Sequence, residues 1–501
     1  MQAPLTVRRS RPMKSVNILL KGFNDSCSKR MLERAFRDIE VGICVSIVED
    51  YATAELPELG TNRVRVSSTQ LRERPYADVD WNTVTPLDEE LIERMRHCEA
   101  VYLLMLGRYG LHADIPYEER KRQYMWHLRY WNHVIETKKI TLSFHFTLPH
   151  QGYDYVIYEL CKLKGIPMFY IDRCYIMDAF FLVDEIEEPG KELEGKMGEL
   201  RLHYPDPSCP VPLTPKFEEY FAAQTQRNEE PWNLFICGKP ELQRSFLHKW
   251  AGVAAKMMLR KPRSFLSFVL SPQFWVRKWA QHKTALLYDR LTKEADLSKP
   301  YIYFPLHQQP EATTCPMGGV FVDQELAVQL LASHLPPGIR LYVKEHPAQG
   351  EMCRSSAFYR SLQEIPSVTL VPRSQDTFGL MKNAVAVATI TGTAAYEGLF
   401  RGTPALVFGH RFIQYAPGMQ RIHTSEDCAR AVRCILEGRE KPSLHDMRLF
   451  LKAVEDCSLP YVGGPPSPHE SRSFEEKADI MGDKIAEKVR QILGVSGTLP
   501  S

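Results

Sequence analysis

The stretch AVAVATITGTAAYEGLF, residues 384–400, decides the fold class. It opens with an apolar, valine-rich run, passes through a turn of hydroxyl-bearing residues and one glycine, and continues as the alanine-rich start of a helix. A buried strand that runs straight into a helix is the unit from which parallel sheets with crossover helices are built. The stretch therefore predicts an α/β protein.

The same pattern recurs on both sides of this stretch and predicts two α/β units. Strands of the second unit are expected at residues 301–305, 340–344, 368–371, 384–389 and 405–408, with helices at 323–334, 393–401 and 425–437. Strands of the first unit are expected at 16–20, 43–48, 100–106, 140–146 and 167–171, with a helix at 154–163.

Composition shifts suggest the domain boundaries. Acidic residues and a series of prolines interrupt the pattern after about residue 183, so we expect irregular and basic helical insertions over 183–300, within an N-terminal domain of residues 1–300. A C-terminal domain of residues 301–458 follows. Residues 459–501 are expected to form a linker and a last helix over 474–493.

Charge and cysteine usage exclude several classes of protein. The 501 residues carry a net charge of +2, which gives no sign of a nucleic-acid partner. The 12 cysteines contain no CxxC pair, which is typical of reduced thiols and a cytoplasmic location. From the sequence we expect neither a secretory leader nor a membrane-spanning run. Nucleotide-binding motifs of the P-loop and GxGxxG types are also missing from the sequence.

The best candidate site lies in the second unit, where the expected strand 340–344 runs into a Lys-Glu-His-Pro element. Lys344 and His346 would point to the same side by the two-residue period of a strand, at the edge that faces the ligand crevice of an open sheet. Together they could neutralise a phosphate. The alternative is a solvated loop histidine.

Two further groups support this site. Thr391, Gly392 and Thr393 precede a helix whose first N–H groups could bind an anion, and Glu397, one turn below, could bind a ribose. The alternative is an ordinary helix cap and a surface glutamate. His307 and Gln308 follow the first strand of this unit, where a cleft between domains would lie; the alternative is a prolyl loop.

In the first unit, His150 and Asp154 follow a strand and are candidates for an acceptor site or a catalytic base. Each could equally be a capping or loop residue. The triplet Asp78-Val79-Asp80 has the form of a metal-binding DxD, but it lies in a polar loop, and we expect no metal and no cofactor.

Residues 251–283 form a basic, aromatic stretch with seven Lys or Arg and no acidic residue. Such a stretch is suited to an anionic membrane surface at the inner face of the membrane. The alternative is a helical pair packed on its own domain with a solvated basic face.

Four motifs together resemble a known family: FPLHQQPEATT (304–314), VKEHP (343–347), TGTAAYEG (391–398) and RGTPALVFG (401–409). They are similar to the capsule polysaccharide biosynthesis family, which includes the Kdo transferases of bacterial capsule assembly. The resemblance covers about residues 301–410 and, more weakly, 144–172. It implies a GT-B-like fold, in which two Rossmann-like α/β domains face a central cleft, and a CMP-sugar as donor. The Lys-x-His-Pro element is also similar to the CMP-holding motif of bacterial sialyltransferases.

By this resemblance His346 and residues 391–393 would contact the CMP phosphate, and Glu397 the ribose. The implied function is a glycosyltransferase that moves Kdo or a related 2-keto sugar acid to a glycan or glycolipid acceptor. One alternative is an enzyme similar to UDP-N-acetylglucosamine 2-epimerase, which needs UDP, catalytic carboxylates and no acceptor. The other is a non-catalytic protein that binds glycan or organises an assembly complex.

Overall fold

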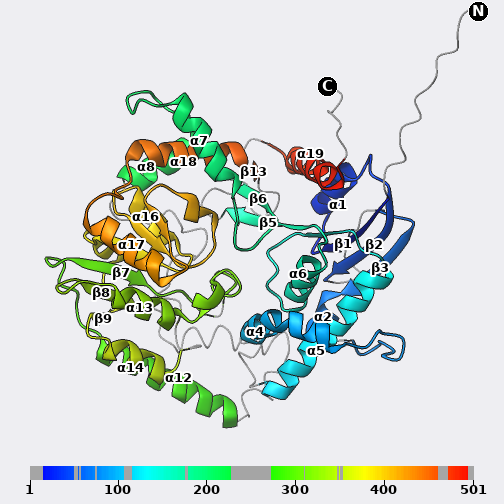
Figure 1. Ribbon diagram of the computed structural model, residues 1–501, viewed down its shortest axis with the longest axis horizontal. Helices are drawn as coiled ribbons and strands as arrows, with labels where there is room; N and C mark the ends of the chain where they lie inside the picture. The colour runs from blue at the N-terminus through cyan, green and yellow to red at the C-terminus, as the bar shows by residue number, and fades with distance from the viewer. Residues whose placement is uncertain are drawn as a thin grey trace, which may run out of the picture. The chain divides into compact units, whose positions relative to one another are not determined.

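A computed structural model of the chain describes residues 15–49, 55, 58–73, 76–106, 115–174, 179–226, 272–309, 311–346, 349, 354–460 and 472–494. These residues form two parallel α/β sheets with flanking helices (Figure 1). The predicted fold class is thereby confirmed at the level of two Rossmann-like sheets.

The first sheet has seven strands in the order β13-β6-β5-β4-β1-β2-β3. Pairing is parallel from β3 through β2, β1 and β4 to β5. The strands are β1 (Val16–Lys21), β2 (Val41–Val48), β3 (Asn62–Ser67), β4 (Leu142–His145), β5 (Met168–Cys174), β6 (Ala179–Val183) and β13 (Leu459–Pro460). Helices in these parts of the chain are α1 (Ser26–Ala35), α2 (Ser68–Glu73), α3 (Glu89–Arg94), α4 (Arg96–Met105), α5 (Tyr117–Thr137) and α6 (Tyr153–Leu163).

The second sheet has six parallel strands in the order β12-β11-β10-β7-β8-β9. They are β7 (Tyr301–Pro305), β8 (Arg340–Lys344), β9 (Val368–Val371), β10 (Ala386–Thr389), β11 (Ala405–Val407) and β12 (Met419–Arg421). The α-helices are α13 (Gln324–Ser333), α14 (Ser356–Glu364), α15 (Thr377–Lys382), α16 (Thr393–Leu399) and α17 (Ser425–Leu436), and η2 (Gly319–Val322) and η4 (Phe412–Tyr415) are single 3-10 turns.

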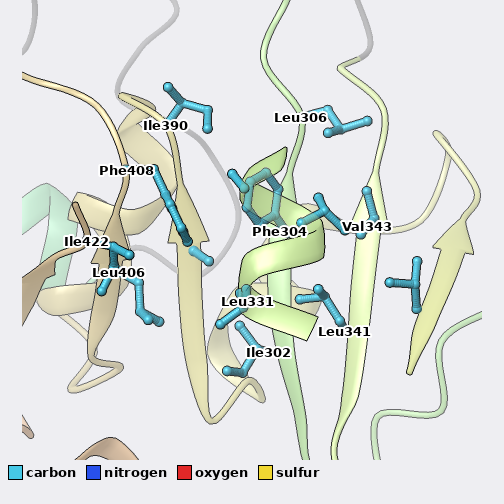
Figure 2. Packing of buried hydrophobic residues seen from close by; sticks show 14 of the residues in the cluster. Ile302, Phe304, Leu306, Leu331, Leu341, Val343, Ile390, Leu406, Phe408 and Ile422 are labelled. Carbon is cyan, nitrogen blue, oxygen red and sulfur yellow. The ribbon is translucent and has the colours of Figure 1, made fainter. Parts of the chain in front are cut away.

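The core of the second unit forms where helices cover this sheet. Ile302 and Phe304 on β7 pack with Val343 on β8 and Leu331 on α13, all essentially without solvent exposure (Figure 2). Strands buried on both faces give the near-continuous apolar runs seen in the sequence. This rigid sheet holds the loops at its carboxyl edge.

The contacts divide the chain differently from the predicted boundaries. One compact unit comprises residues 1–103, 117–173 and 459–501, and the other 104–116 and 174–458. Four further helices lie in the described part of the second unit: α7 (Glu192–His203), α8 (Pro215–Gln226), α12 (Pro272–Leu291) and α18 (Leu444–Cys457), with α7 and α8 packed against α18. The described parts of 183–300, residues 183–226 and 272–300, thus lie in the second unit and contain helices, whereas residues 227–271 lie outside the described part of the chain.

The last helix, α19 (Phe474–Leu493), matches its predicted bounds and packs against α1. Arg30 and Arg34 of α1 make two-pronged ion pairs with Asp479 and Asp483 of α19, at 2.6–2.8 Å. The C-terminal segment is thus part of the first unit and not a free appendage.

One predicted strand is wrong. Residues 100–105 belong to helix α4, in which Cys98, Tyr102 and Met105 are buried at helical spacing while Leu104 is half exposed. A short apolar run cannot be assigned from periodicity alone. Strand β3 was not predicted because arginines alternate along it, as suits the edge of a sheet.

Among the described residues, no helix combines the length and the apolar character required to cross a membrane.

Candidate functional site

The candidate site lies where the second sheet reverses its strand order. From β7 the chain proceeds outward to β8 and β9, then returns to β10 on the other side of β7 and continues to β11 and β12. Ligands of open α/β sheets bind at such a switch point, outside the carboxyl ends of the strands. His307 and Gln308 follow β7 there, and residues 391–393 follow β10.

His307 joins these two loops. Its Nε2 lies 2.8 Å from the Thr389 hydroxyl and accepts the N–H of Thr391 at 3.3 Å, while the same hydroxyl accepts the N–H of Gly392 at 2.9 Å. Burial lowers the pKa of His307 to about 3. The ring is therefore neutral, with its proton on Nδ1 and its Nε2 lone pair facing the β10 turn.

Gly392 is required by this close approach. A β-carbon at position 392 would lie 2.8 Å from both Cε1 of His307 and Oγ1 of Thr389, closer than real contacts allow. The sequence predicted an anion site at this turn, and the structure adds a reason for the glycine that is internal to the protein. The Thr391 hydroxyl donates to the Thr313 carbonyl at 2.7 Å, and Thr393 begins α16.

Two glutamines hold the backbone of the loop after β7. Gln324 accepts from the N–H of His307 at 2.7 Å and donates to its carbonyl at 3.2 Å. Gln349 likewise accepts from the N–H of Gln309 at 2.7 Å and donates to its carbonyl at 3.0 Å. These reciprocal amide bonds fix the backbone around Gln308. The Gln308 side chain is half-buried and makes no hydrogen bond within the described part of the chain.

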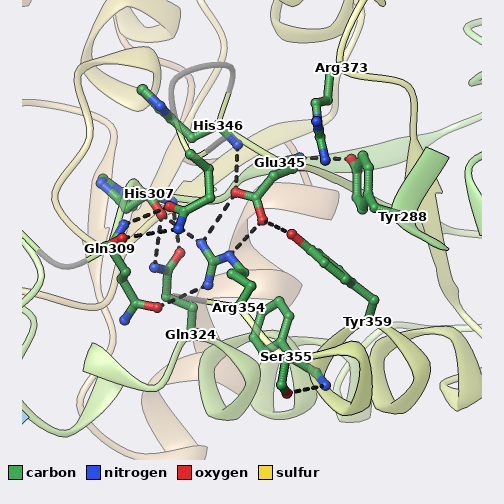
Figure 3. Close-up of polar contacts among 12 residues, drawn as sticks. Tyr288, His307, Gln309, Gln324, Glu345, His346, Arg354, Ser355, Tyr359 and Arg373 are labelled. Atoms are coloured by element: carbon green, nitrogen blue, oxygen red, sulfur yellow. Dashed lines mark hydrogen bonds and ion pairs between the residues drawn. The ribbon is translucent and has the colours of Figure 1, made fainter. Parts of the chain in front are cut away.

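A buried ion pair supports the same loop (Figure 3). The Glu345 carboxylate is fully buried and accepts from Arg354 Nε at 2.6 Å, from the Tyr359 hydroxyl at 2.6 Å and from the N–H of His346 at 2.7 Å. Arg354 also donates to the His307 carbonyl at 2.6 Å and to Gln309 Oε1 at 3.0 Å. The loops after β7 and β8 are therefore parts of one network.

Lys344 and His346 differ in their surroundings. Lys344 is buried and donates to the Gln375 carbonyl and, at 2.8 Å, to the Thr377 hydroxyl, and burial lowers its pKa to about 8. It thus reaches the segment that starts α15. His346 follows the end of β8 and is half-buried, and burial lowers its pKa.

Glu397 is largely buried on α16, with 9% exposure. Arg401 donates to the Glu397 carbonyl at 2.9 Å. Burial lowers the pKa of Arg401, and the charge of Glu397 offsets part of this effect. The alternative that Glu397 is a surface residue is therefore excluded. A role toward ribose stays a prediction.

The first sheet has its own switch point, between β1 and β4. Lys21 and His145 end these two strands and are paired in register. Lys21 Nζ lies 3.0 Å from Asp154 Oδ2 and donates to the Thr147 hydroxyl at 2.9 Å. Asp154 also accepts the N–H of Gln151 at 2.6 Å. Its complete burial and these partners favour the capping interpretation of Asp154.

His150 lies in the loop that this ion pair holds. Its Nδ1 is 2.5 Å from the Leu148 carbonyl, which places the proton on Nδ1 and the lone pair on Nε2. His145, by contrast, is fully buried, and burial lowers its pKa to about 3.

The DxD triplet shows the geometry of a turn. Asp80 Oδ1 accepts from both the backbone and the side chain of Asn82 at 3.0 Å. Within the described residues, no three His, Cys, Asp or Glu side chains are grouped as a metal site would require.

Residues 278–428 match the family of capsule polysaccharide biosynthesis proteins. The resemblance seen in the motifs is confirmed over this segment. No curated protein matches the chain. The capsule polysaccharide biosynthesis segment contains the switch point of the second sheet and every candidate residue around it, from His307 to Glu397.

Solved structures are similar over most of the chain, but at low scores. The β-Kdo 2,7 transferase KpsC of Thermosulfurimonas dismutans shares 10% identity over 93% of this chain and 99% of its own, with a TM-score of 0.33. UDP-GlcNAc 2-epimerase of Methanocaldococcus jannaschii shares 8% identity over 88% of this chain and 99% of its own, with a TM-score of 0.26. Sucrose-phosphate synthase of Thermosynechococcus elongatus shares 11% identity over 96% of this chain and 100% of its own, with a TM-score of 0.25. Scores this low carry no argument about activity.

Sequence reasoning missed the residues that support the site. Gln324, Gln349, Arg354 and Tyr359 lie in helices or loops with no motif of their own. The sequence signal that could have indicated them was Glu345, a carboxylate directly after a buried strand. A buried charge must be paired, so Glu345 implied a basic partner elsewhere in the chain.

Proposed function

We propose that this chain is a glycosyltransferase of surface or capsular polysaccharide biosynthesis that uses a CMP-activated sugar, such as Kdo or a related 2-keto sugar acid. One observation carries the proposal: at the switch point of a parallel sheet, within the segment that matches the capsule family, the chain holds neutral His307, Gln308 and a glycine turn on one fixed network. The end of β8 adds His346 beside them.

In the proposed reaction, an acceptor hydroxyl attacks the anomeric carbon and its proton passes to a base. The bond to CMP breaks, and CMP leaves with the electron pair. Negative charge therefore grows on the phosphate, and donors aimed at it lower the barrier. Because burial lowers the pKa of His346, its ring is neutral before the donor binds and gains affinity for a proton when the phosphate arrives. A single phosphate needs no metal ion as counter-charge.

The acceptor side is proposed for the first unit. Asp154 is held in the ion pair with Lys21, so we assign it to fixing the loop after β4. His150, with its lone pair on Nε2, is the proposed base. The scattered cysteines favour a cytoplasmic location.

The test is calorimetric titration with CMP, UDP and GDP, followed by turnover with CMP-Kdo. We expect CMP to bind best. His346→Ala should lower turnover by about a hundredfold or more, as expected for loss of one transition-state donor. The matched control is His334→Ala, which removes another half-buried histidine, bonded to Ser425, from the same unit.

Three results would contradict the proposal. Preference for UDP, with interconversion of UDP-N-acetylglucosamine in the absence of an acceptor, would assign the chain to the epimerase class. Glycan binding without any donor turnover would assign it to a non-catalytic role. Unchanged turnover in His346→Ala would remove His346 from the mechanism.

A further inference from the structure

Helix α12 (Pro272–Leu291) carries an exposed apolar stripe that the proposed reaction does not use. Its C-terminal end is anchored: Tyr288 is fully buried, and its hydroxyl donates to the Val371 carbonyl at 2.6 Å. Nearer its start, Trp275, Val276 and Trp279 are 55%, 67% and 61% exposed. Figure 1 shows α12 beside α14, which its C-terminal part contacts.

The exposed residues lie on one side of the helix. Trp275 and Trp279 are one turn apart, and Leu286, also exposed, follows seven residues later on the same side. The Lys283 ammonium lies 3.4 Å from the centre of the Trp279 ring. Tryptophans beside lysines are typical of helices that rest in the interface of a bilayer, where indole rings and cationic groups both find partners.

The net positive charge of α12 indicates which kind of partner binds this face. Helix α12 carries four basic residues, Arg277, Lys278, Lys283 and Arg290, against one acidic residue, Asp289, which gives it a net charge of +3. A second copy of the same helix would bring like charges together, whereas an anionic surface neutralises them. Residues 251–271 of the predicted membrane stretch lie outside the described residues, so the inference rests on α12 alone.

We propose that the exposed face of α12 is a docking surface for anionic phospholipid membranes. The tryptophans enter the headgroup region, and the basic residues attract the negative lipids. Each basic residue near such a surface contributes about fivefold in binding, which corresponds to about 1 kcal/mol, and salt screens this attraction. The proposal is independent of the donor sugar and of the reaction.

The experiment is co-sedimentation of the full chain with phosphatidylcholine vesicles, with and without phosphatidylglycerol, at low and high salt. We expect binding only with phosphatidylglycerol and a decline at high salt. Trp275→Ser with Trp279→Ser should lower the partition constant at least tenfold, and Arg277→Gln, Lys278→Gln and Lys283→Gln together by roughly a hundredfold.

Matched controls carry the same kinds of change at exposed positions elsewhere. Leu202→Ser with Val320→Ser removes two exposed apolar side chains, and Arg122→Gln, Arg430→Gln and Lys484→Gln remove three positive charges. These variants should bind as the parent does. Equal binding to neutral vesicles, or equal losses in test and control variants, would overturn the proposal. So would self-association that the tryptophan variant abolishes, without vesicle binding, because it would assign the face to a second copy of the chain.

Discussion

Removing Arg354 should destabilise the second unit and loosen the candidate site at the same time. Arg354→Met keeps an unbranched side chain but removes the charge. The Arg354 and Glu345 side chains are 3% and 0% exposed, and their charged atoms lie 2.6 Å apart. Loss of one partner of a buried ion pair leaves an uncompensated charge, which costs about 3–5 kcal/mol. We expect a loss of this size in the free energy of unfolding.

The assay is urea unfolding, with hydrogen exchange of the peptides that cover β7 and the loop after it as a local readout. The midpoint should fall at unchanged slope. Exchange in residues 306–309 should rise, because the His307 carbonyl and Gln309 lose Arg354 as a donor. CMP affinity should fall with it.

Two comparisons make this reasoning refutable. Glu345→Gln combined with Arg354→Met removes both charges and should cost no more than the more harmful single change, since charges in contact couple strongly. Arg430→Met breaks an ion pair with Asp427 whose arginine is 58% exposed, and should cost less than about 1 kcal/mol. A loss below about 1 kcal/mol in Arg354→Met would show that the pair does not support the site.

Two further outcomes are expected. Gly392→Ala places a β-carbon against the His307 ring and the Thr389 hydroxyl, so the melting temperature should fall and the CMP affinity measured by calorimetry should fall at least tenfold; unchanged values of both would show that the ring can move aside. Buried His127 and His145 in the first unit have pKa values lowered to about 3, below the ordinary histidine value of about 6.5 in the unfolded chain. Protons therefore favour the unfolded chain below pH 6.5, and stability should be lost as the pH falls from about 6.5 toward 3, by up to about 1.4 kcal/mol per pH unit for each histidine. Urea midpoints at a series of pH values check this, and His145→Gln should lower the slope by about a third, because His307 in the second unit has the same low pKa.

The sequence predicted the second unit better than the first for a physical reason. Strands such as β7, β8 and β10 are buried on both faces, so their apolar runs and the polar residues that follow them stand out. In the first unit, β3 is a charged edge strand and α4 is a short apolar helix, and neither has a period that distinguishes it. The sequence could thus assign the residues after the strands to the ligand crevice, but it could not show how far their side chains are exposed to solvent.

Partners distant in sequence were beyond sequence reasoning. Lys21 binds Asp154 across more than a hundred residues. Gln324 and Gln349 act on backbone groups, which leave no pattern in side-chain types. The sequence therefore placed Asp154 after the strand correctly but could not show that its carboxylate is fully buried.

The packing of α19 on α1 makes completion of the first unit depend on the end of the described chain. Residues 16–173 leave the ribosome early, yet the surface of α1 that bears Arg30 and Arg34 has no partner until Asp479 and Asp483 are synthesised. The second unit, of which residues 174–458 lie between these segments and include all six strands of its sheet, can form that sheet first. Nascent chains tend to fold domain by domain in order of synthesis. Here the second unit would reach its native state before the first unit, which is complete only after α19 has been synthesised.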